Sequence, residues 1–153
     1  MKKDVEILIR SAQVMDGDSE EMELRTLGRF YDKDGLYYLS YEETEATGFE
    51  GHSTVLKFGK QPKVVMTRFG KARSQLIIEL NECNTCSYST EYGSMAIDVR
   101  GRQHEIQLKE DSGRLFLAYT LDLGIVFLTT RYSTPASRIS LRSLVSSATL
   151  IPL

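Results

Sequence analysis

The most reactive side chains in this sequence belong to Cys83 and Cys86, which two residues separate in the segment NECNTC. This spacing occurs in metal sites and in redox pairs. A structural zinc site needs four Cys or His ligands, and the sequence holds only two histidines, His52 and His104, each alone in its stretch. A redox CxxC depends on a helix N-terminus, whereas this motif falls between two strand-like runs. We therefore interpret residues 81–86 as a polar hairpin connection and expect no metal and no cofactor.

A second candidate is a carboxylate with an arginine partner. Glu43 continues the alternating face that starts at Tyr37, and Arg68 continues the face of Val64 and Met66. A carboxylate on an inward face needs a partner, because buried charges are rarely left unpaired. Two interpretations stay open. The pair is a polar anchor for a ligand, or it is a rim salt bridge or two solvated side chains at the ends of the strands.

Tyrosines and one histidine complete the candidate ligand-binding set. A tyrosine can turn an apolar ring toward a small molecule and orient it with the hydroxyl, although tyrosines more often fill the core or rim of a sheet. His104 shares the predicted inward face of Ile106 and Leu108. The predicted lining of a ligand site is Tyr37, Tyr41, Glu43, Arg68, Tyr88 and His104.

Catalytic motifs are absent from the sequence. It contains no G-x-S-x-G elbow, no Walker or Rossmann glycine pattern, no H-E-x-x-H and no EF-hand loop. An enzyme would need titratable groups that converge in a pocket, and the only trio available is Glu43, Arg68 and His104. We therefore predict no catalytic residues and a chain that is not an enzyme.

Composition and charge narrow the class of protein. The 153 residues, 41% hydrophobic and 26% charged, suit one soluble globular domain. The apolar run after the two N-terminal lysines is interrupted by Glu6 and Arg10, so it is no signal peptide, and no run approaches the roughly 20 residues of a membrane helix. We expect a cytoplasmic protein. A formal net charge of −2 predicts neither a nucleic-acid nor a membrane partner.

Period-2 alternation dominates residues 1–122 and predicts half-buried β-strands. The alternating runs are joined by short segments rich in Gly, Asp and Pro, which connect antiparallel neighbours. These segments lie at 15–19, 32–35, 59–63, 70–74, 100–103 and 110–113. The predicted fold is all-β, a single antiparallel up-and-down β-barrel of eight to ten strands. Closure removes exposed edges, and such a barrel is either filled or holds one small ligand. A two-sheet sandwich is the competing geometry.

The order of motifs resembles one known family. The motifs are YLSYEET at 38–44, R-x-G at Arg68 and Gly70, Y-x-T-x-x-G from Tyr88 to Gly93, and G-R-L-x-x-x-Y from Gly113 to Tyr119. Over about residues 4 to 124 they resemble the DUF1934, or YwiB-like, family of small bacterial proteins with a calycin-like, lipocalin-type β-barrel. The resemblance implies a barrel domain over 1–124 and suggests a ligand cavity, but a fold does not settle a function.

The C-terminal segment, residues 125–153, reads differently. Residues 123–153 carry three arginines and no Asp, Glu or Lys, whereas residues 1–122 carry 16 Lys and Arg against 21 Asp and Glu. One interpretation, which the composition favours, is a reading-frame shift near Gly124, which sequencing the locus would test. In the other, residues 125–131 form the final strand and 137–148 an appended helix or loose end. An exposed apolar tail would promote self-association.

Two functions remain after these exclusions. The first is a non-catalytic binder of a small, partly apolar molecule inside the barrel. The alternative is a protein-interaction or regulatory barrel whose interior is filled by side chains. We predict the first of these functions and keep the second as the alternative.

Overall fold

Ten antiparallel strands make up the structure, a computed structural model that describes residues 2–15, 18–45, 49–90, 93–109, 112–123 and 139–152. The prediction of an all-β, antiparallel barrel of eight to ten strands is confirmed. The strands are β1 (Lys2–Met15), β2 (Asp18–Lys33), β3 (Leu36–Glu42), β4 (Ser53–Phe58), β5 (Lys63–Phe69), β6 (Ser74–Glu79), β7 (Cys83–Thr90), β8 (Gly93–Leu108), β9 (Gly113–Leu123) and β10 (Ile139–Pro152).

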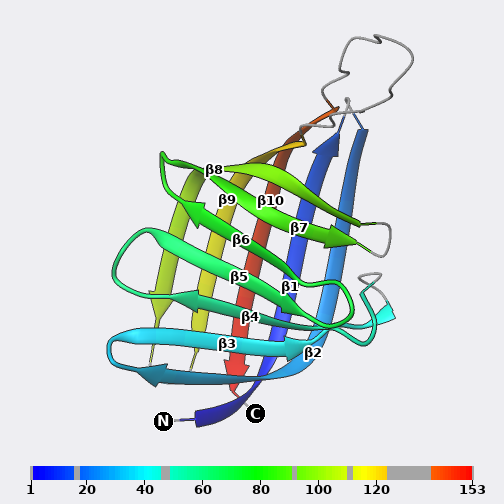
Figure 1. Cartoon of the computed structure of the whole chain (residues 1–153). Coiled ribbons are helices and arrows are strands. Elements are labelled where there is room, and N and C mark those ends of the chain that lie inside the picture. Colours follow the sequence, from blue (N-terminus) through cyan, green and yellow to red (C-terminus); the bar gives the residue numbers. More distant parts are fainter. Residues whose placement is uncertain are drawn as a thin grey trace, which may run out of the picture.

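The strands follow one another around the barrel in chain order, and β10 closes it (Figure 1). Strand β10 pairs with β9 on one side and with β1 on the other, where Val5 lies opposite Pro152. The two-sheet sandwich is therefore wrong. The appended helix or loose end over 137–148 is also wrong, because Ile139–Pro152 is a strand. The predicted final strand at 125–131 lies outside the described residues.

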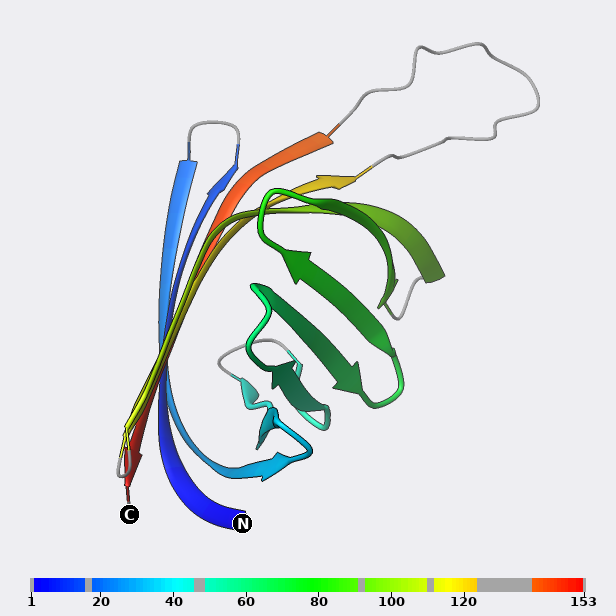
Figure 2. The same cartoon turned by 90° about the vertical axis from the view of Figure 1, so that its left-hand side faces the viewer.

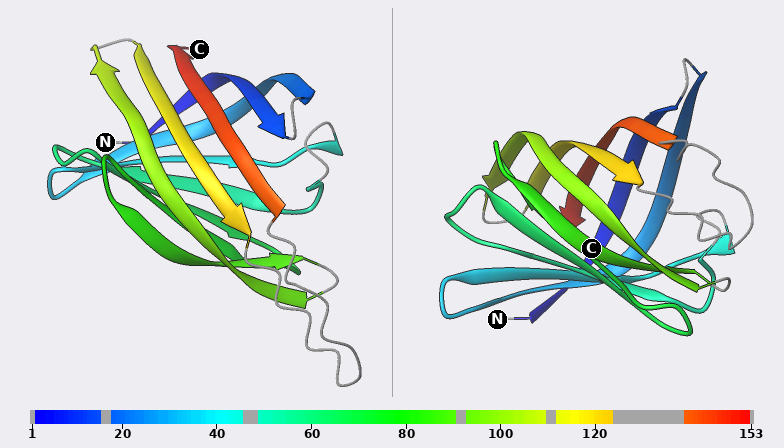
Figure 3. Two further views of the ribbon diagram at one scale, coloured as in Figure 1. Left: turned by 90° about the horizontal axis from the view of Figure 1, so that it is seen from above. Right: turned by 45° about the horizontal axis from the view of Figure 1, so that its top comes forward.

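The barrel has two unequal walls (Figures 2 and 3). We call strands β8, β9, β10, β1 and β2, which have 11 to 16 residues each, the long wall. Strands β3 to β7, with 6 to 8 residues each, form the short wall across from it. Alternate residues of a strand face the interior, so both walls contribute side chains to one core.

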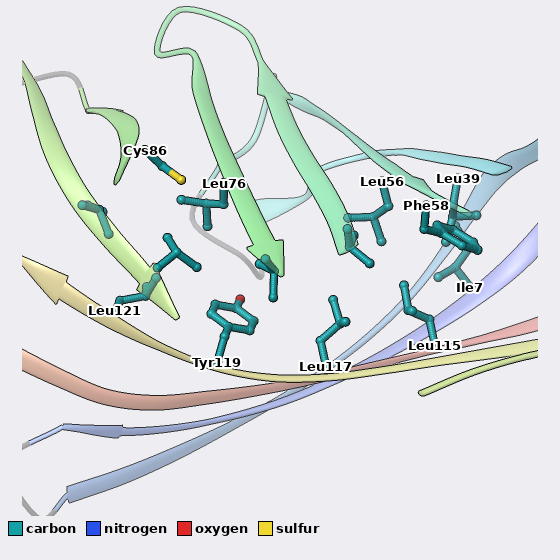
Figure 4. Close-up of a cluster of buried hydrophobic side chains, with 14 of the residues drawn as sticks. Ile7, Leu39, Leu56, Phe58, Leu76, Cys86, Leu115, Leu117, Tyr119 and Leu121 are labelled. Atoms are coloured by element: carbon teal, nitrogen blue, oxygen red, sulfur yellow. The ribbon is translucent and has the colours of Figure 1, made fainter. Parts of the chain in front are cut away.

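The core side chains come from alternate positions of their strands, and they include Cys86, which the sequence placed in a hairpin connection. On the short wall the register aligns Leu39, Leu56, Met66 and Leu76 in one apolar row across β3 to β6. From the long wall, β9 turns buried Leu115, Leu117 and Tyr119 toward them (Figure 4).

Two predicted connections are in fact strand. Residues 100–103 were expected to form a loop, but β8 runs through them with a bulge between Gly101 and Gln103. A Cβ on Gly101 would lie 2.3 Å from the carbonyl oxygen of Glu79, so only glycine lets the two backbones approach this closely. The hairpin reading of 81–86 is wrong for Cys83 and Cys86, which belong to β7. The turn itself is made by Asn81, whose φ is 62°.

Side chains replace backbone hydrogen bonds along the seam between β6 and β7. In the described chain, Gln75 opposite Ser87 is the one pair in ladder register between these strands. Further along, the Ile77 N–H donates to Cys86 Sγ at 3.2 Å, and the thiol donates to the Asn84 carbonyl at 3.7 Å. Burial raises the pKa of the Cys86 thiol, which keeps it protonated. Two further bridges cross the seam, Ser74 to Ser89 and Asn84 to Glu79.

This seam predicts unequal roles for the two cysteines. Cys86→Ala leaves the Ile77 N–H without its partner, and we expect the free energy of unfolding to fall by about 1–2 kcal/mol. The exposed Cys83 provides the matched control, and Cys83→Ala should change stability by less than about 0.5 kcal/mol. Urea denaturation measures both values. Equal values for the two variants would contradict the role given to the Cys86 thiol.

Candidate functional site

At one end of the short wall the inward-facing row changes from apolar to polar. The register places Tyr41 opposite Thr54, Thr54 opposite Arg68, and Arg68 opposite Ser74. We call these four residues the polar row. Thr54 and Ser74 are buried, with exposed fractions of 0% and 5%. Buried hydroxyl and guanidinium groups need partners, so this level of the barrel is where a site of specific chemistry would lie.

Glu43 follows β3 directly and turns its carboxylate onto the polar row. Its backbone N–H donates to the His52 carbonyl at 2.8 Å, which holds the chain beside the start of β4. Glu43 Oε1 accepts a hydrogen bond from Thr54 Oγ1 at 2.6 Å and lies 3.6 Å from Arg68 Nη2. The side chains of Glu43 and Arg68 are 2% and 17% exposed. The ion pair suggested by the sequence is therefore present and buried, and the reading as two solvated side chains is wrong.

Phe49 covers the arginine of this ion pair, and His52 holds the connection that carries Phe49. The Arg68 guanidinium carbon lies 3.6 Å from the centre of the Phe49 ring, a cation–π contact. His52 joins two connections, since Nδ1 contacts the Phe49 carbonyl at 3.0 Å and Nε2 is 3.3 Å from the Ala72 backbone N. A backbone N–H can only donate, so Nε2 accepts and Nδ1 carries the proton. Gly70 makes room for the ring, because a Cβ there would lie 2.4 Å from it.

The electrostatics of the cluster follow from its burial. Burial, and after it the Glu43 carboxylate, raise the pKa of the Tyr41 phenol far above its usual value, while Arg68 opposes them. Tyr41 is therefore a neutral phenol throughout the physiological range. Arg68 Nε is buried and has no hydrogen-bond partner in the described chain. The cluster can thus donate one further hydrogen bond from a low-dielectric setting.

The predicted site residues divide between the two ends of the barrel. Tyr41, Glu43 and Arg68 come together as described. Tyr88 packs against the core and lies near the same end, because its neighbour Ser89 bonds to Ser74.

The other two predicted residues lie elsewhere. Tyr37 lies toward the far end of β3, where it stacks on Phe30 and packs against Phe58 at ring distances of 5.8 and 5.7 Å. His104 lies on β8 opposite Leu117 of β9. It lines an open pocket of about 370 Å³ together with Gly59 and Lys60. Gly59 follows the opposite end of β4 from Thr54, so His104 does not converge with Glu43 and Arg68.

Sequence reasoning missed Thr54, Ser74, Phe49 and His52. Thr54 and Ser74 carried a usable signal, because each is a polar residue at an inward position and begins or nearly begins its strand. Phe49 and His52 carried no such signal. They lie in a connection without alternation, and only the fold brings Phe49 over Arg68 and His52 beside Phe49.

Comparison with known proteins places the chain in a family. Residues 7–133 match the family model described as a domain of unknown function, DUF1934. The chain belongs to the DUF1934 family. It is also 27% identical over 126 residues to a Bacillus subtilis (strain 168) protein called uncharacterized beta-barrel protein YwiB, and the match spans 81% of this chain and 87% of that protein. The DUF1934 match continues past Gly124 to residue 133, and the frame shift stays a prediction.

A solved structure shares the fold. The crystal structure of the ywiB protein from Bacillus subtilis superposes with a TM-score of 0.78 at 19% identity, and it covers 99% of this chain and 93% of that one. In the described chain no three His, Cys, Asp or Glu side chains gather in a way that could hold a metal ion. Those residues also include no helix long and apolar enough to cross a bilayer.

The buried ion pair predicts a large effect of removing one charge. Glu43→Gln keeps the size of the side chain but leaves Arg68 buried without its countercharge, which should lower the free energy of unfolding by about 3 kcal/mol. Adding Arg68→Met should restore much of that loss. The exposed pair Arg10 and Glu23, 3.0 Å apart, is the control, and Glu23→Gln should cost less than about 1 kcal/mol. Denaturant unfolding that gives similar losses at Glu43 and Glu23 would contradict a buried pair.

The position of His104 predicts a pH dependence of stability. Burial lowers the pKa of His104 below its usual value of 6.5, and Nε2 has no hydrogen-bond partner among the described residues. As the pH falls through about 6.5 the unfolded chain binds a proton that the folded chain resists, so the free energy of unfolding falls. His104→Gln should reduce this fall between about pH 7.5 and 5.5. Identical pH profiles for the two proteins would contradict it.

Proposed function

We propose that this chain is a non-catalytic binding protein that holds a small, partly apolar molecule at the polar row. As part of this proposal, the barrel is of the calycin type, because a barrel of this kind can hold one small ligand. The proposal includes neither nucleic acid nor a membrane surface as a partner. It assigns no catalytic residue, and the cytoplasm stays the expected compartment. Self-association through residues 125–153 is a separate prediction.

One observation carries the proposal, the buried Glu43–Arg68 pair with an unused Arg68 N–H. A buried ion pair is weak evidence of a stabilising role, because desolvation offsets most of its attraction. The donor atom Arg68 Nε is buried and has no hydrogen-bond partner in the described chain, a state that costs free energy. A ligand oxygen at Nε would remove that cost. This favours a binding role over a purely structural one.

The surroundings of the pair support a partly apolar ligand. Tyr41, which belongs to the polar row, and Tyr88 both pack against the hydrophobic core, and the ring of Phe49 lies over the Arg68 guanidinium. Binding sites for small molecules combine such apolar walls with a few placed polar groups. A molecule with one polar end and an apolar body matches this lining.

A second function, a protein-interaction barrel, is favoured by a different observation. The interior of the described chain is densely occupied by buried aliphatic side chains. On the outer face of β2 and β3, Tyr31 and Tyr38 stack at 4.7 Å, and Lys57 lies 6.0 Å above Tyr38. Aromatic side chains are enriched in protein interfaces. Tyr31→Ser with Tyr38→Ser would weaken a partner's binding on this reading and leave ligand binding intact.

Native mass spectrometry of the purified protein tests the proposal. The native mass is compared with the denatured mass of the same sample. We expect an extra mass that leaves on denaturation, and the released compound should rebind unchanged to the refolded chain. A compound recovered in altered form would overturn the non-catalytic assignment.

The contrary result needs a second measurement, because a ligand can be lost during purification. The chain has no tryptophan, so an added fluorescent apolar probe reports binding without background from indole. A bare chain mass together with no saturable uptake of the probe would overturn the binding function and favour the interaction barrel.

A further inference from the structure

The charges of the proposed site balance within the described chain. Glu43 contributes one negative and Arg68 one positive charge, while the Tyr41 phenol stays neutral. The other charged side chains nearby in sequence are exposed to solvent and are screened by it: Glu42, Glu45, Glu50, Lys71 and Arg73. A charged ligand group would therefore add an uncompensated charge to a buried setting. Such a charge is strongly disfavoured unless it is paired.

The charges of Glu43 and Arg68 are paired, but their hydrogen-bonding groups are not all paired. Glu43 Oε1 already accepts from Thr54 and lies beside Arg68 Nη2. Arg68 Nε is the group left over, and it can only donate. The Phe49 ring covers a face of the guanidinium, whereas the N–H points along the guanidinium plane. The missing partner is an acceptor oxygen in that plane.

From these two observations we infer that the ligand is an uncharged molecule whose carbonyl-type oxygen accepts a hydrogen bond from Arg68 Nε, with an apolar body against Tyr41 and Phe49. Amides, esters, ketones and lactones have this chemistry. Carboxylates and amines do not, because each brings a charge that the Glu43–Arg68 pair has no means to balance. This inference rests on the proposed function and specifies its ligand class.

Three eight-carbon probes at about pH 7.5 separate these classes: octanamide, octanoate and octylammonium, which are neutral, anionic and cationic at this pH. Displacement of a fluorescent apolar dye measures their affinities for the full chain. We expect octanamide to bind at least about tenfold more tightly than either charged probe. A preference for octanoate or octylammonium would overturn the neutral class. If dye binds but none of the three probes displaces it, the inferred ligand class is overturned. If no dye binds, the proposed function itself fails.

Two variants test the residues. Arg68→Lys keeps the charge but removes the Nε donor, and should weaken octanamide binding by about tenfold, while Arg10→Lys on the surface should leave it unchanged. An unchanged affinity in Arg68→Lys would overturn the role of Nε. Glu43→Gln gives the site a net positive charge and should reverse the preference toward octanoate.

The Glu43→Gln test also works for a poorly stable variant, because ligand binding raises the melting temperature. Octanoate should then raise the melting temperature of Glu43→Gln more than that of the natural chain, and octanamide should not. Equal shifts with octanoate in the two proteins would overturn the charge-balance argument.

Discussion

The pairing of β10 with β1 is the constraint on which the rest of this structure depends. Without it, β10 and β1 would each present unpaired backbone groups along an open edge of the sheet. With it, the ten strands close into one barrel, and the described core side chains come from both of its walls. The level at which a residue lies along the barrel axis is then set by its register. Residues far apart in sequence meet because they share a level.

The polar row shows what this shared register does. Tyr41, Thr54, Arg68 and Ser74 come from four strands, yet they form one level because β3 to β6 pair without a shift. The next level inward is apolar. Glu43 and Arg68 are thereby held in a buried setting beside the hydrophobic core, where a charge interacts strongly with its partner. The same burial makes an unmet donor costly, and this cost is the thermodynamic basis for ligand binding.

Among the described neighbouring strands, β6 and β7, whose seam lies beside the polar row, have the fewest residues in ladder register. Ser74 belongs to both, since it faces Arg68 across β5 and bonds to Ser89 across the seam. Regions with few backbone ladder bonds open at lower free energy than the rest of a fold. Within the described chain, the short wall therefore holds both the polar row and the strand pair with the fewest residues in ladder register.

Sequence reasoning succeeded where a side chain obeys the alternation of its own strand. That alternation correctly turned Glu43 and Arg68 to one interior, and it predicted the barrel class. It failed where the backbone departs from regular pairing. The bulge at Gly101 looked like a loop, since glycine is common in turns, and Cys83 looked like part of a turn although it is the first residue of β7. Local composition cannot distinguish a glycine in a turn from a glycine under a neighbouring backbone.

The amino-acid sequence by itself determined the class of fold, the inward faces of the strands and an inward carboxylate that needs a charged partner. These follow from the period of a strand and from the cost of an unpaired buried charge. Only the tertiary structure decided which residues share a level. It placed Thr54 and Ser74 at the level of the ion pair and Phe49 over Arg68. It placed Tyr37 and His104 toward the other end of the barrel. The physical reason is that register and closure arise from all strands together, whereas alternation belongs to each strand alone.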